Sequence, residues 1–149
     1  MPKLMQGLMM AGVAAFLVAG QCGAEDKLQN FSVKHALAST VAKAKLDSGI
    51  KIYMMGQSVP GLQKRFGSYK SNKRSNAGGK TSQDACDVAF ISALIALQQR
   101  ADREGGNAVV DIYSLTKDKK MQSSENYSCN AGGMMVNVVL MGTVARVGK

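Results

Sequence analysis

Residues 81–110, TSQDACDVAFISALIALQQRADREGGNAVV, predict one long helix, a two-glycine stop and the start of a strand. Thr81 or Ser82 can accept a hydrogen bond from the free N–H groups of the first helical turn. At the other end, Gly105 or Gly106 can adopt the left-handed conformation that terminates helices. Local signals therefore mark both ends of the helix.

The apolar residues of this segment predict which face of the helix is buried. They recur at spacings of three and four, as in a helix packed against a core, and comprise Cys86, Ala89, Phe90, Ala93, Leu94 and Leu97, with Val88, Ile91 and Ile95 widening the same face. Asp84 and Asp87 lie in the first turns, where carboxylates complement the positive end of the helix dipole. We therefore expect the middle of the helix to be deeply buried.

The other segments alternate between strand patterns and turn signals. A short helix is expected over residues 33–45, residues 25–34 are expected to be loosely ordered, and a polar loop is expected over residues 72–80. Strands are predicted over residues 49–55, 62–71, 108–116, 125–131 and 134–147, with a bulge or close backbone approach at Gly142. The predicted fold class is α+β, with one long helix packed on a mainly antiparallel sheet of about four or five strands and a short N-terminal helix.

The first 24 residues have the pattern of a secretory signal peptide. Lys3 is followed by an uncharged run that ends in small residues, which favours cleavage after Ala24. A retained anchor is the alternative, but the apolar stretch of about 14 residues is shorter than the roughly 20 that span a bilayer. A lipid on Cys22 is a further alternative. The predicted division is a signal at 1–24, an N-terminal segment at 25–48 and an α+β domain at 49–149.

The cysteine count predicts one disulfide. Removal of Cys22 with the signal leaves Cys86 and Cys129, an even pair in a chain bound for an oxidising compartment, the periplasm or the exterior. Two buried free thiols are the alternative. A metal site on this pair is not expected, because the only histidine, His35, is remote in sequence and no Cys-x-x-Cys spacing occurs.

The chain is strongly basic, with a formal charge of +9. In an envelope compartment this charge favours lipid phosphates, acidic glycans or acidic proteins as partners, and nucleic acid is not expected. One basic stretch without acidic residues is a candidate anion-binding surface, and it carries Lys64, Arg65, Lys70, Lys73, Arg74 and Lys80. The alternative is a solvated basic face whose aromatic residues, Phe66 and Tyr69, point into the core.

An apparent phosphate-binding loop, Gly78-Gly79-Lys80-Thr81, precedes the long helix. A complete loop of this kind requires a glycine five residues before the second one, so that backbone N–H groups can surround the phosphates. Arg74 occupies that position. The motif is therefore incomplete, and nucleotide hydrolysis is not expected.

Other chemistry has weaker support in the sequence. Methionine thioethers can bind Cu(I), although methionine is more often a flexible core residue; the candidates are Met54, Met55, Met121, Met134, Met135 and Met141. No motif-framed nucleophile or paired acid appears, so no catalytic residues are assigned. His35 is expected to be solvent-facing or simply packed.

Four segments resemble a group of small exported bacterial proteins that often carry the label excinuclease ATPase subunit. They lie within about residues 44–147 and read KAKLDSGIKIYMMG, FGSYKSNKRSNA, QDACDVAFISALIALQQRADREGGNAVVDIYS and ENYSCNAGGMMVNVVLMGTVARV. More distantly, the chain resembles the YbjQ-like proteins and the outer-membrane lipoprotein that senses stress for the Rcs phosphorelay. These resemblances imply a compact α+β domain.

The expected function is that of an exported, non-enzymatic bacterial envelope protein that binds another envelope component and needs no cofactor. After signal cleavage no membrane span is expected. A periplasmic copper-binding protein is the first alternative. A nucleotide-dependent DNA-repair subunit, as the family label implies, is the second.

Overall fold

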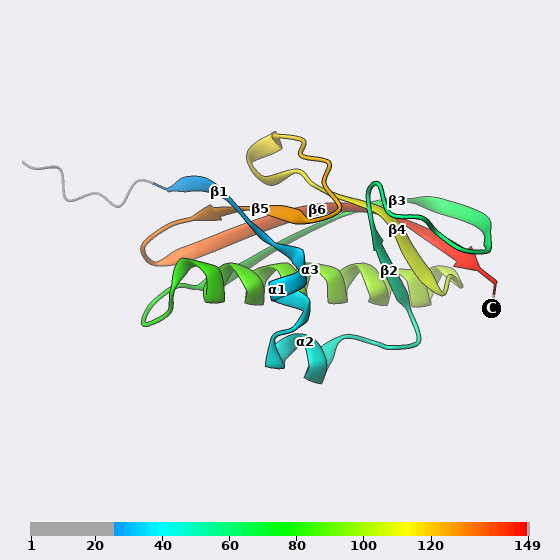
Figure 1. Cartoon of the computed structure of the whole chain (residues 1–149), viewed down its shortest axis with the longest axis horizontal. Coiled ribbons are helices and arrows are strands. Elements are labelled where there is room, and N and C mark those ends of the chain that lie inside the picture. Colours follow the sequence, from blue (N-terminus) through cyan, green and yellow to red (C-terminus); the bar gives the residue numbers. More distant parts are fainter. Residues whose placement is uncertain (1–25, 149) are drawn as a thin grey trace, which may run out of the picture.

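The structure, a computed structural model, describes residues 26–148. The predicted signal peptide and Cys22 lie outside these residues. Within them the chain forms a curled six-stranded sheet with one long helix across one face (Figure 1). The elements are β1 Lys27–Ser32, α1 Val33–Leu37, α2 Thr40–Lys45, β2 Lys51–Met54, β3 Leu62–Asn76, α3 Ser82–Glu104, β4 Ala108–Ser114, a 3-10 turn at Thr116–Asp118, β5 Asn126–Ala131 and β6 Met135–Val147.

Strand β6 organises the sheet. It pairs antiparallel with β3 along one side and with β4 and β5 on the other, one after the other along its length. Strand β1 pairs antiparallel with β5, and β2 pairs parallel with β4. The mixed α/β fold with one long helix agrees with the prediction, but the sheet is larger than the predicted four or five strands.

The additional strand, β1, comes from the segment that was expected to be loosely ordered. Its sequence, KLQNFS, has no alternating apolar pattern, and none of its residues is fully buried. The strand forms through a regular antiparallel register that runs from Lys27 opposite Ala131 to Ser32 opposite Asn126. Main-chain hydrogen bonds of this kind leave little trace in the side-chain pattern, which explains the wrong prediction.

The long helix α3 has the predicted ends. The Thr81 hydroxyl accepts a hydrogen bond from the Asp84 N–H at 3.1 Å, and Gly105 takes the left-handed conformation at φ 81°. The six central residues of the predicted face and Ile91 are buried, whereas Val88 and Ile95 are half-buried. Gln98 and Asp87 are buried as well. The helix packs along β3 and β6, so the prediction of a deeply buried helix centre is confirmed.

The N-terminal helix is divided in two. The prediction was one helix over residues 33–45, whereas α1 ends at Leu37 and α2 begins at Thr40. Between them the Ser39 side chain accepts a hydrogen bond from the Ala42 N–H at 3.3 Å. Serine bonded in this way starts a new helix in preference to continuing the old one, which explains the break.

Strand β3 is longer than predicted. Residues 72–76, which were expected to belong to a polar loop, continue the strand because they pair with the first residues of β6, from Asn72 opposite Val139 to Asn76 opposite Met135. At Gly142, where a bulge or a close backbone approach was predicted, the register between β4 and β6 shifts between Val110 and Tyr113, and side chains fill the space beside the glycine. A Cβ atom there would lie 2.7 Å from Val109 Cγ1 and 3.1 Å from Leu97 Cδ1, so a larger residue would push α3 off the sheet.

The predicted disulfide joins α3 to β5. Cys86 and Cys129 are both fully buried, their Cα atoms are 6.0 Å apart and they are separated by 43 residues in sequence. A buried disulfide is compatible with an oxidising compartment. Within residues 26–148, no helix is long and apolar enough to cross a bilayer.

Replacement of both cysteines by serine is expected to lower the free energy of unfolding by about 4 kcal/mol, because the unfolded chain would lose a long closed loop. Urea denaturation of the oxidised protein and of the Cys86→Ser/Cys129→Ser variant measures this difference. Equal midpoints for the two proteins would show that the disulfide contributes nothing to stability.

Candidate anion-binding site

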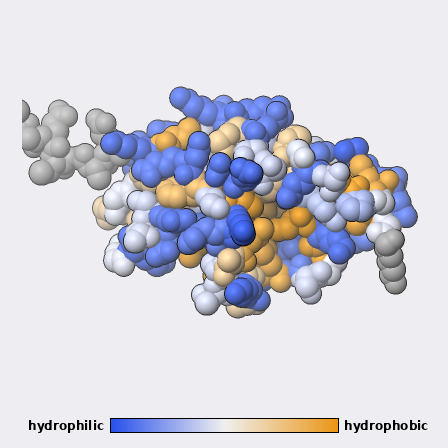
Figure 2. Space-filling model, viewed as in Figure 1, coloured by the Kyte–Doolittle hydropathy of each residue, from blue (hydrophilic) through white to orange (hydrophobic). Residues whose placement is uncertain are grey.

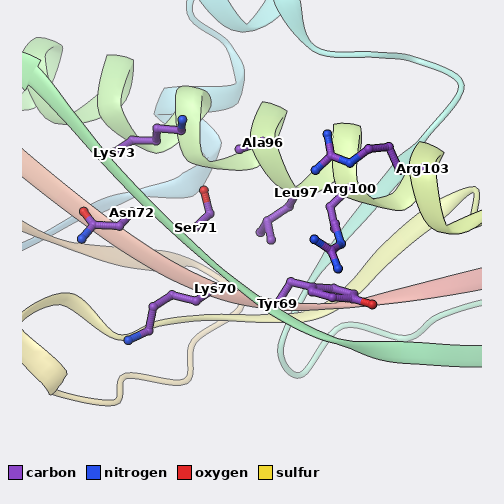
Figure 3. A pocket seen from close by; sticks show the side chains of 9 residues that line it. All are labelled: Tyr69, Lys70, Ser71, Asn72, Lys73, Ala96, Leu97, Arg100 and Arg103. Carbon is purple, nitrogen blue, oxygen red and sulfur yellow. The ribbon is translucent and has the colours of Figure 1, made fainter.

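A pocket of about 250 Å³ lies between β3 and the C-terminal half of α3 (Figure 3). Side chains three or four residues apart on the helix and two residues apart on the strand face this pocket. It is lined by Tyr69, Lys70, Ser71, Asn72, Lys73, Ala96, Leu97, Arg100 and Arg103. On α3, positions 96, 100 and 103 lie at spacings of four and three, which place them along one side of the helix.

Alternation along β3 divides its side chains between the two faces of the sheet. Tyr69, Ser71 and Lys73 extend toward α3, whereas Lys70 and Asn72 point away from it (Figure 3). The direction of Asn72, away from α3, agrees with its hydrogen bond: the Asn137 side-chain N–H donates to Asn72 Oδ1 at 2.5 Å. The face that meets α3 therefore combines an aromatic ring, a hydroxyl group and an ammonium group.

Arg100 is held in position inside the pocket. Its guanidinium carbon lies 4.0 Å from the centroid of the Tyr69 ring, and its Nε lies 2.9 Å from Glu104 Oε1, one helical turn away. Stacking on the ring and pairing at this spacing restrict the side chain. A guanidinium group has five N–H donors, so several remain available to an anion.

The hydroxyl of Ser71 is buried without a partner. The residue is 5% exposed, and its Oγ makes no hydrogen bond to any residue in the described part of the chain. A buried polar group without a partner costs free energy, so native structures satisfy nearly all of them with protein, water or ligand. The Ser71 hydroxyl is therefore available as a donor to whatever occupies the pocket.

The charge around the pocket has one sign. Among residues 26–148, four of those that line it are cationic, namely Lys70, Lys73, Arg100 and Arg103, and no carboxylate lines it. Glu104 offsets part of the charge of Arg100 from the side. The ends of Lys73 and Arg103 extend toward each other from opposite sides of the pocket (Figure 3). An anion is the ligand that this arrangement favours.

The six basic residues predicted from the sequence do not form one patch. Lys73 lines the pocket with its side chain, and Lys70 lies on the rim with its side chain turned to the other face of the sheet. Arg74 lines a separate small pocket with Asp26 and Met135. Strand geometry causes this separation, because neighbouring residues of an extended chain point in opposite directions.

The remaining predicted residues have other neighbours. The Lys64 ammonium lies 4.9 Å from the centroid of the Phe66 ring, and Arg65 pairs with Asp111 at 3.0 Å. Lys80 lies in the short turn before α3, where its N–H donates to the Ala77 carbonyl. None of the three lines the pocket.

Three residues on which the anion site depends, Ser71, Arg100 and Arg103, were not predicted as site residues. Both arginines lie in the C-terminal part of α3, where cations are favoured whatever their function, and Ser71 lies on an ordinary strand. Their spacing on α3 and their alternation on β3 were visible, but the register between helix and strand was not. The sequence pattern alone therefore could not predict that Ser71, Arg100 and Arg103 line the same pocket.

A second polar cluster surrounds Asp87. The residue is 3% exposed, and both carboxylate oxygens have partners. Tyr127 donates its hydroxyl to Oδ1 at 2.5 Å, and His35 Nδ1 lies 2.7 Å from Oδ2. Burial raises the pKa of Tyr127 well above its usual range, and the hydrogen bond to Asp87 raises it further. This cluster joins α1, α3 and β5 beside the disulfide.

Tyr127→Phe is expected to lower the free energy of unfolding by about 1–3 kcal/mol, because it leaves a buried carboxylate oxygen without its donor. The Tyr127 contribution is present below the usual tyrosine pKa of about 10 and is lost as the pH rises above it, because only the unfolded chain then releases the proton. Urea denaturation at about pH 8 and about pH 11 should therefore show a smaller difference between the two proteins at the higher pH. A difference that does not change with pH would contradict this account.

A larger pocket, of about 430 Å³, lies between α1 and the segment that leads into β5, with Val33 and Leu37 among its lining residues. Figure 2 shows apolar surface near the middle of this face, between the positions of α1 and β2 in Figure 1. Lys34 and Glu125 line this pocket with opposite charges. It therefore lacks the single sign of charge that marks the pocket on β3.

Metal ligands do not gather among residues 26–148, where no group of three His, Cys, Asp or Glu side chains is placed to hold an ion. The methionines considered for copper differ in exposure. Met54 is buried, whereas Met134, just before β6, and Met135, its first residue, are 82% and 49% exposed.

Comparison of the chain with protein-family models, with curated proteins and with solved structures gives no match. The resemblance to the excinuclease-labelled proteins and to the stress-sensor fold therefore stays a prediction from the sequence.

Proposed function

We propose that this protein is an exported envelope protein that binds an anionic envelope component through the pocket between β3 and α3. One observation carries the proposal: the unpartnered, buried hydroxyl of Ser71 lies in a pocket whose charged lining residues are all cationic. Donors with no acceptor of their own suit a ligand that supplies oxygen atoms and negative charge.

The groups that line the pocket favour binding over catalysis. Arginine, lysine, serine and tyrosine supply donors there, whereas the one histidine and the buried Asp87 belong to the separate cluster with Tyr127. A general base beside the serine would be needed to activate it, and none of the described residues that line the pocket is a histidine or a carboxylate. The proposed role is therefore recognition of an anion.

Export is the second part of the proposal. The buried Cys86–Cys129 disulfide supports an oxidising compartment, and the signal pattern before residue 25 supports the same location. The periplasm or the exterior contains phosphorylated lipids, acidic glycans and acidic proteins. The group recognised in each case is a phosphate, a sulfate or a carboxylate.

Inorganic phosphate is expected to bind the exported protein, and the Arg100→Gln/Arg103→Gln variant is expected to bind it at least about tenfold more weakly, a loss of about 1.4 kcal/mol. Two charge-assisted hydrogen bonds are lost in this variant, and solvent exposure limits the contribution of each. Isothermal titration calorimetry at low salt measures the affinity.

The matched control removes two exposed lysines from α2, as Lys43→Gln/Lys45→Gln. It lowers the net charge by the same amount but leaves the pocket intact, so its affinity should stay close to that of the parent protein. Equal losses of phosphate affinity in the two variants would show that phosphate binding depends only on the net charge of the protein. No phosphate binding by the parent protein would remove the proposal.

A further inference from the structure

Strand β3 has one edge without a partner strand. It is 15 residues long, and among the described strands it pairs only with β6. Figure 3 shows β3 in the foreground, with β6 behind it and α3 above. Main-chain N–H and C=O groups on such an edge remain available to another extended chain. The pairing of β3 with β6 is regular over residues 67–76, and its register shifts occur before residue 67. The part of the edge with regular strand geometry is therefore about ten residues long.

The charges on this edge select its partner. Residues 62–76 include no Asp or Glu, and their cations are Lys64, Arg65, Lys70, Lys73 and Arg74. Asp111 neutralises only Arg65. A second copy of the same edge would place like charges opposite one another, which is destabilising and is a known protection against self-association. An acidic segment would place opposite charges there.

Both faces of an added strand would meet cations. Its side chains would alternate between the two faces, as those of β3 do. Residues on the α3 side would lie beside Lys73 and the arginines of the pocket, and residues on the other side would lie beside Lys70 and Arg74. Neighbouring strands lie about 4.8 Å apart, so a carboxylate on the α3 side is within reach of the pocket entrance.

We infer that the free edge of β3 binds an extended acidic segment of another protein as an additional strand, with one of its carboxylates in the pocket. In this mode of binding, main-chain hydrogen bonds contribute affinity for any extended segment, and the side-chain charges select an acidic one. The inference rests on the proposed anion site, because the pocket carboxylate is the contact that fixes the position of the segment along the edge.

The probe is a ten-residue peptide of alternating glutamate and threonine with neutral ends, titrated into the exported protein by calorimetry. Two further peptides carry N-methyl groups on every second residue, one on the glutamates and one on the threonines. In an added strand only one of these two sets of N–H groups faces β3. One methylated peptide should therefore bind at least about tenfold more weakly than the parent peptide, while the other binds nearly as well.

Each outcome decides the inference. Equal binding of all three peptides would show attraction by charge alone and would overturn strand addition, as would binding of acidic glycans or anionic vesicles in the absence of peptide binding. Phosphate binding without peptide binding would overturn the inference and leave the proposed function intact. Lack of binding by phosphate and peptide alike would remove both.

The pocket contact has its own control. Arg100→Gln should weaken the peptide at least about fivefold, whereas Lys43→Gln on α2 should leave it unchanged. If methylation weakens only one peptide but Arg100→Gln leaves the affinity of the parent peptide unchanged, the assignment of its carboxylate to the pocket would be overturned.

Discussion

The rest of the structure depends on the burial of one face of α3 against β3 and β6. Alanines at positions 85, 89, 93 and 101 are fully buried, and their small side chains allow close contact between helix and sheet. Gly142 permits the same closeness on β6, where a Cβ atom would meet Leu97. This packing also places Arg100 over Tyr69, so one contact between helix and sheet creates both the core and the candidate site.

The two ends of α3 have different roles. Near its start the disulfide through Cys86 and the bonds of Asp87 to Tyr127 and His35 connect the helix to β5 and α1. Near its end the pocket residues face β3 and solvent. The Tyr69 ring and Glu104 already restrict the Arg100 side chain there, so less side-chain freedom is lost when an anion binds.

Local signals allowed the sequence to predict α3, its caps and the cysteine pair, because each depends on a few neighbouring residues or on a count. Strand β1, the last residues of β3 and the division at Ser39 were not predicted, since main-chain pairing and a single hydroxyl bond decide them. For the site, Lys73 was among the predicted residues. Its partners on α3 required the register between helix and strand, which no periodicity specifies.

The pocket between β3 and α3 is the proposed anion site. Amide NMR spectra of the isotope-labelled protein during a titration with inorganic phosphate test this assignment residue by residue. Saturable shifts are expected only at residues 69–73 and 96–103, with none on α2, whose lysines are also exposed. Shifts spread over all lysine-bearing surfaces, or absent from β3 and α3, would contradict it.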